Sequence, residues 1–234
     1  MSYRLHRPVL REFVSAAMGR HLGLDMDGSI HLREALEGAE YFALLASSHA
    51  DKQMDTWRDV PFRYSRNDLG GWLDIVSNVI DSGHGYVISE VHSHPTINTK
   101  PSSESHDWIA LPDLTRLKLL EQKYERPFNG TIVAGFMGYV SGVALSDGLN
   151  KRFLDGLIQN ARGPPARDAL LVQAERLESL RKRVVHHGRL DISELVEALT
   201  DDYMSDLYRR IAANGKTLVA MYDSSGNDVP LKII

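Results

Sequence analysis

Apolar residues in the first half of the chain follow two different spacings. Over residues 8–21 they recur at the interval of an amphipathic helix, and Pro8 suits its first turn. Residues 41–46 form a short, continuous apolar run, which predicts a buried strand over 40–46. Helical spacing returns over 65–85, and residues 86–94 again predict a strand. This alternation predicts a mixed α/β (α+β) fold.

The spacing also predicts a helical segment late in the chain. A Gly-Pro-Pro sequence at 163–165 is the clearest linker signal. We therefore predict one domain over residues 1–150 and a helical extension over 163–234, which could pack on the same core. The other elements predicted here are amphipathic helices at 114–125, 168–185 and 192–213, a glycine-containing hairpin at 131–145, and a terminal hairpin with a Ser-Ser-Gly-Asn turn at 216–234.

Composition narrows the classes of protein to which the chain can belong. Hydrophobic residues make up 43% of the 234 positions and charged residues 25%, which is ordinary for a globular protein. The formal net charge of −4 leaves no basic footprint, so nucleic acid is not expected as a principal partner. The N-terminus lacks the apolar run of a signal peptide, and no stretch approaches the ~18 apolar residues of a membrane span. We expect a cytoplasmic protein with no membrane partner.

A histidine-rich motif follows the strand predicted at 86–94. The chain has no cysteine, so a metal ion here would be held by histidine, carboxylate or water. The motif reads HSHPTINTKPSSESHD over 92–107. Alternate residues of a strand share a face, so His92 and His94 project to one side about 7 Å apart, and their imidazoles can converge on one zinc ion. Asp107 would be the third ligand, which leaves the fourth position for the water of a catalytic site.

The motif resembles the signature of the JAMM (MPN+/JAB) family of zinc isopeptidases, in particular its bacterial deubiquitinase-like members. That signature contains an upstream glutamate, His-x-His-Pro, a short loop, a serine and an aspartate. The resemblance covers roughly residues 8–146, and His92, His94 and Pro95 match the histidine ligands and the proline after them. It implies one zinc ion per chain and a JAMM/MPN fold, which is a cytidine-deaminase-like mixed sheet flanked by helices.

The loop after the histidines departs from the family pattern. The family aspartate usually lies eleven residues after the second histidine, where this chain has Ser105. Asp107 lies two residues further on and is the better candidate for the ligand, while Asp113 is the weaker one. Ser102 fits the family's oxyanion-binding serine by its distance from the histidines, and Ser103 fits it by its distance from Asp107.

Two glutamates compete for the role of general base. The resemblance places this residue at the start of an apolar strand after the first helix, and Glu40 opens the run EYFALLAS there, 52 residues before His92. A carboxylate at the site would accept a proton from the water and deliver it to the leaving amine. Glu90 shares the face of His92, but it is anchored on the same strand as the ligands. Glu40 is therefore the favoured base.

The resemblance implies an enzyme that cleaves after the C-terminal glycine of ubiquitin or a ubiquitin-like protein, and activating and conjugating enzymes of the same pathway are possible further partners. Residues 48–67 contain Trp57, Phe62 and Tyr64 and are a candidate for gripping the substrate, although these aromatics could equally be buried anchors of a surface loop. Two other functions stay open: a metal-free MPN-like scaffold, and a RadC-like JAB protein of DNA metabolism. The first has no need of the histidines and Glu40, and the second gains no support from the acidic charge.

Overall fold

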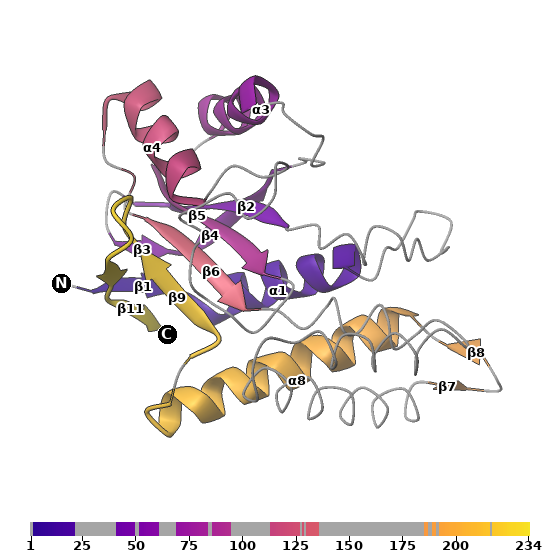
Figure 1. Cartoon of the computed structure of the whole chain (residues 1–234). Helices are drawn as coiled ribbons and strands as arrows, with labels where there is room; N and C mark the ends of the chain where they lie inside the picture. Colours follow the sequence, from indigo (N-terminus) through magenta and orange to yellow (C-terminus); the bar gives the residue numbers. More distant parts are fainter. Residues whose placement is uncertain are drawn as a thin grey trace, which may run out of the picture.

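Helices and strands mix along the chain and form an α+β structure (Figure 1). The computed structural model describes residues 2–21, 41–49, 52–60, 69–83, 86–94, 113–126, 128, 130–135, 185–186, 189–190, 192–215 and 217–234. The helices are α1 (Arg7–His21), α3 (Leu69–Asp81), α4 (Asp113–Tyr124) and α8 (Ile192–Ala212). The longer strands are β2 (Phe42–Ser47), β4 (Thr56–Asp59), β5 (Tyr86–His94), β6 (Thr131–Gly135) and β9 (Val219–Tyr222). The shorter ones are β1 (Tyr3–Leu5), β3 (Gln53–Met54), β7 (Val185–His186), β8 (Arg189–Leu190), β10 (Asp228–Val229) and β11 (Leu231–Ile233).

A six-stranded mixed sheet forms the centre of the structure. Its strand order is β10-β9-β6-β5-β2-β4, in which only the β5–β6 pair is parallel. A parallel sheet of β11, β1 and β3 brings the two ends of the chain side by side, and β7 pairs with β8. The strand with the two histidines is therefore an interior strand, paired along both edges.

Helices cover both faces of the central sheet (Figure 1). Helices α1 and α8 bury one hydrophobic cluster against the sheet, and α3 and α4 bury a second cluster against the other face. The register of β2 against β5 shifts between Leu45 and Ala46, which is a β-bulge. Val87 consequently packs toward α3 and α4, whereas Ile88 and Val91 both pack toward α1 and α8.

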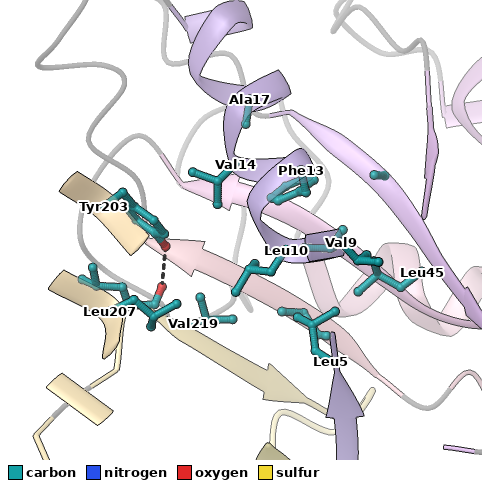
Figure 2. Packing of buried hydrophobic residues seen from close by; sticks show 14 of the residues in the cluster. Leu5, Val9, Leu10, Phe13, Val14, Ala17, Leu45, Tyr203, Leu207 and Val219 are labelled. Carbon is teal, nitrogen blue, oxygen red and sulfur yellow. Dashed lines mark hydrogen bonds between the residues drawn. The ribbon is translucent and has the colours of Figure 1, made fainter. Parts of the chain in front are cut away.

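The larger cluster explains why residues 7–21 form a helix against this sheet. The buried residues of α1 follow the i, i+3, i+4 spacing of a single helix face, and Figure 2 labels five of them within the larger cluster: Val9, Leu10, Phe13, Val14 and Ala17. Pro8 stands in the first turn, where its missing N–H costs no hydrogen bond. The helix predicted at 8–21 is confirmed.

Most of the other elements predicted from spacing are also present where the chain is described. The strands expected at 40–46 and 86–94 are β2 and β5, and the helices expected at 114–125 and 192–213 are α4 and α8. Helix α3 lies within the predicted 65–85 segment. Of the helix predicted at 168–185, all but Val185 lies outside the described residues, and Val185 begins β7 instead.

The hairpin predicted at 131–145 is wrong for its first arm. Residues Thr131–Gly135 form β6, whose two edges pair with β5 and β9. A strand has only two edges, so no edge of β6 is left for a hairpin partner over these residues. The sequence pattern was right about a strand but could not reveal that its neighbours come from distant parts of the chain.

The segment at 48–67 is not simply a loop, because it contains β3 and β4. Trp57 of β4 donates from Nε1 to Glu12 Oε2 at 2.8 Å, and its ring packs edge-on to Phe13 at 6.5 Å. These contacts make Trp57 a partly buried anchor on α1. Phe62 and Tyr64, the other aromatics proposed to grip a substrate, lie outside the described residues.

The C-terminal segment supplies strands to both larger sheets. The predicted terminal hairpin is confirmed by β9 and β10, whose turn is held by Asp223 accepting from the backbone N–H groups of Ser225 and Asn227, both at 2.9 Å. Hydrogen bonding from Asn227 lowers the pKa of the Asp223 carboxyl below its usual range. Strand β11 then leaves the hairpin to pair with β1. Among the described residues, no helix is both long and apolar enough to cross a membrane.

A buried tyrosine joins α8 to the start of β9. The Tyr203 hydroxyl donates to the Leu218 carbonyl at 3.2 Å inside the larger cluster (Figure 2), and burial raises its pKa, so it remains a donor at neutral pH. Removing it in Tyr203→Phe leaves a buried carbonyl without this partner, and we expect a loss of about 1–3 kcal/mol in the free energy of unfolding in urea.

The same helix offers a matched control. The buried Tyr208 hydroxyl has no hydrogen-bond partner within the part of the chain that the structure describes, and the Arg7 guanidinium lies 4.4 Å from the ring centre. Tyr208→Phe removes no such bond and keeps the ring, so its free energy of unfolding should stay near that of the unmodified protein. Equal losses in the two variants would show that the Tyr203 bond does not stabilise the fold.

Candidate metal centre

The two histidines of the motif lie at the carboxyl end of the parallel strand pair β5 and β6. His94 ends β5 opposite Gly135, which ends β6. His92 and His94 are spaced two apart on a strand, so both project from the face that α3 and α4 cover. In open α/β sheets, ligands bind outside the carboxyl ends of parallel strands. The histidines therefore occupy a position suited to a site.

The imidazoles of His92 and His94 converge. Their Nε2 atoms lie 3.2 Å apart, and both side chains are buried. Two nitrogen ligands at ~2.0–2.1 Å from a tetrahedral zinc ion stand about 3.3 Å apart, so the observed separation fits two ligands of one such ion. As ligands of one ion, both rings would present the Nε2 lone pair and carry their proton on Nδ1. The same 3.2 Å contact also has the length of an Nε2–H···Nε2 hydrogen bond, in which one ring donates. The pair can supply two of the four corners of a zinc site.

A buried ionic group lies on the other side of His92. Glu90 Oε1 is 3.2 Å from His92 Nδ1 and 3.9 Å from the Arg116 guanidinium of α4. All three side chains are at most 2% exposed. The distance to Nδ1 is short enough for a hydrogen bond, although the angle departs from good hydrogen-bond geometry.

Phe42 of β2 links the members of this group. Its ring stacks on His92, with 5.5 Å between ring centres, and the Arg116 guanidinium lies 4.6 Å from its centre. A cation over an aromatic face is attracted by the ring quadrupole, so Phe42 stabilises the position of Arg116 as well as that of the imidazole. Residues of β2, β5 and α4 together restrain His92.

Backbone pairing at the end of β2 is fixed by Ser93, which lies between the two histidines. Ser93 N donates to the Tyr41 carbonyl, and Tyr41 N donates to Ser93 Oγ, both at 3.0 Å. Tyr41 directly follows Glu40 in the sequence, but Glu40 itself lies outside the described residues.

The other expected site residues are not tested by the structure. Ser102, Ser103 and Asp107 lie outside the described residues. Asp113 begins α4, and its side chain is likewise outside the description. Within the residues that are described, no group of three or more metal-ligating side chains is placed to hold an ion. The third ligand, the general base and the oxyanion-binding serine therefore stay predictions.

Arg116 is the residue of this region that the sequence patterns did not single out. It stands four residues before Leu120 in α4, so the two share a helix face, and Leu120 is fully buried. A cation on the apolar face of a predicted helix is the signal that could have identified Arg116, because an arginine is rarely buried unless paired.

The structure also bears on the choice of general base. Glu90 lies beside Nδ1 of His92, so the imidazole ring separates its carboxylate from the two Nε2 atoms. This arrangement disfavours Glu90 as the base.

Comparisons with known proteins add no family to this description. No protein-family model matches the chain, and a search of curated proteins found no match either. The chemical interpretation therefore depends on the site geometry and on the resemblance of the motif.

Proposed function

We propose that the chain is a zinc-dependent isopeptidase or peptidase of the JAMM type, which cleaves after the C-terminal glycine of ubiquitin or a ubiquitin-like protein. The observation that carries the proposal is the 3.2 Å separation of His92 Nε2 and His94 Nε2 at the end of β5. This separation brings both nitrogens within reach of one ion, which supports a shared metal over separate roles for the two rings. The His-x-His-Pro motif and its serine-rich loop support the same reading.

Each residue of the proposed site has one task. His92, His94 and Asp107 hold the zinc ion, which when bound lowers the pKa of a water molecule and polarises the substrate carbonyl. Glu40 accepts the proton of the water and returns it to the departing amine, and Ser102 donates a hydrogen bond to the carbonyl oxygen as it becomes negative. The choice of Glu40 is supported by the next residue, Tyr41, whose backbone is hydrogen-bonded to Ser93 between the histidines.

The form of the site and the resemblance together support this substrate class. The histidines lie at the end of an interior strand whose two edges are already paired, so a substrate would reach them past the strand end, as an extended chain. Glycine residues let such a chain bring its backbone close to a metal ion, because they carry no side chain. A flexible tail that ends in glycine meets both conditions.

Metal removal tests this function. We expect the protein to cleave a ubiquitin-like protein with a C-terminal extension directly after the terminal glycine, and a zinc chelator should stop the reaction. Adding zinc back should restore it. Intact-mass measurement of the products identifies the bond that is cut.

Three outcomes of this assay would contradict the proposal. Cleavage that survives the chelator would exclude a zinc-dependent reaction. Cleavage of arbitrary unfolded peptides would remove the specificity for a ubiquitin-like protein. No cleavage of any ubiquitin-like protein by a zinc-loaded sample would refute the proposed isopeptidase activity.

A further inference from the structure

We propose that Glu90 is a positioning residue for the metal ligand His92, and that Arg116 holds Glu90 in place. The proposal rests on the proposed zinc site. It adds two residues that hold a metal ligand in place and that belong neither to the motif nor to the proposed mechanism. It assigns a role to a buried ionic group that the reaction itself does not use.

The first argument is the direction of the two ring nitrogens of His92. Nε2 faces His94 at 3.2 Å, and Nδ1 faces Glu90 at 3.2 Å. Ligation through Nε2 requires the ring proton to be on Nδ1, which is the nitrogen beside the carboxylate. Ligating histidines in proteins commonly donate this second N–H to a carboxylate, which fixes the ring orientation and raises the basicity of the ligand.

The second argument is the cost of burying Glu90. A buried carboxylate without a compensating charge is strongly unfavourable. Arg116 supplies that charge at 3.9 Å, and both side chains are about 2% exposed. A salt bridge buried so deeply adds little to folding when compared with apolar packing, so a local role for its charge is a better explanation than stability.

The third argument is that contacts hold every member of the group. The Glu90 backbone N–H donates to the Gly130 carbonyl at 3.3 Å, and Phe42 contacts both the imidazole and the guanidinium. The Nδ1–Oε1 contact is short but poorly aligned. Hydrogen bonds at sites of this kind are often imperfect without the ligand and align when it binds.

Zinc affinity measures this role without any enzyme assay. In a competition titration with a chromophoric chelator, Glu90→Gln should bind zinc about 10–100-fold more weakly, which is the typical effect of losing an outer partner of a ligand. Glu90→Leu should bind more weakly still, because glutamine keeps an oxygen that can accept from Nδ1 and leucine does not. Glu121→Gln, the same substitution on α4, should leave the affinity unchanged.

Arg116 is tested through its effect on Glu90. Arg116→Met should weaken zinc binding, as the Glu90 variants do. Lys118→Met, at an exposed position of the same helix, should leave zinc binding unchanged. If Arg116 acts through Glu90, the double variant with Glu90→Gln should lose much less affinity than the product of the two single losses.

A spectroscopic signal separates positioning from a general structural role. In the zinc-loaded protein the Nδ1–H resonance of His92 should be shifted downfield and protected from exchange by the carboxylate. Glu90→Leu should lose both properties while its melting curve without zinc still shows a cooperative fold. A merely structural contribution would lower the melting temperature and leave the resonance where it is.

The outcomes for the two proposals can be told apart. If the unmodified protein binds zinc tightly and Glu90→Gln binds it within about threefold as well, the role of Glu90 is refuted and the proposed function stands. If the unmodified protein binds no zinc, the proposed function fails and the role of Glu90 fails with it. An unchanged His92 resonance in Glu90→Leu would also overturn the role of Glu90.

Discussion

Replacing both His92 and His94 with alanine is expected to abolish tight zinc binding. The proposed site has three protein ligands, so the double variant would keep only Asp107, and one carboxylate does not hold zinc against water. The zinc affinity should fall by more than the ~10–100-fold that is typical when a residue hydrogen-bonded to a metal ligand is removed. Metal analysis after dialysis should find one zinc ion per unmodified chain and none in the variant.

The control for this experiment is another histidine of the chain. His49 follows β2 at the end of the strand away from Phe42, and it is exposed, so His49→Ala should keep its zinc. His94→Gln gives a second check, because it removes a ligand and leaves little empty space in the core. Stoichiometric zinc in the double alanine variant would place the metal elsewhere and refute the assignment.

The same measurement chooses between the two candidate aspartates. Asp107→Ala should lower the zinc affinity sharply if the loop is two residues longer than in the family pattern. Asp113→Ala should then bind as the unmodified protein does. The reverse result would assign the third ligand to the first residue of α4.

Glu40→Gln is expected to keep zinc but to lose most of the hydrolytic activity. Glutamine matches glutamate in size, yet its amide cannot take up the proton of the water. Removal of a general base typically costs about 10²–10⁴-fold in rate. The rate on the ubiquitin-like fusion and the zinc content of the same sample are the two quantities to measure.

Two comparisons make this result specific to Glu40. Glu194→Gln changes an exposed glutamate in the first turn of α8 and should leave the rate unchanged. Excess zinc should restore much of any activity lost in Glu90→Gln, because that variant is weakened in binding, but it should not rescue Glu40→Gln. A rate within a few-fold of the unmodified protein would remove Glu40 from the mechanism.

Local spacing predicted the elements that surround the site. The apolar run before Ser48 and the run before the histidines became the neighbouring strands β2 and β5, because both are buried between helices on two faces. Spacing could not predict which strands pair. The neighbours of β6 and the pairing of β1 with β11 join distant residues, and the bulge in β5 changes which side chains share a face.

The two histidines could be identified from the sequence because strand alternation already places them on one face. Their support could not be identified in the same way. Glu90 stands two residues before His92, so a shared face was predictable, but its partner Arg116 comes from a helix 26 positions further along. Only the packing of α4 on the sheet brings that guanidinium to the carboxylate and to the ring of Phe42.

Anomalous diffraction at the zinc edge from crystals of the zinc-loaded protein tests the central claim most directly. The claim is that His92 and His94 bind one zinc ion through their Nε2 atoms at the end of β5. It predicts a single strong anomalous peak within ~2.0–2.1 Å of both Nε2 atoms, with a carboxylate as the third protein ligand. A zinc-loaded crystal with no peak between these two nitrogens, or with its peak elsewhere on the molecule, would contradict it.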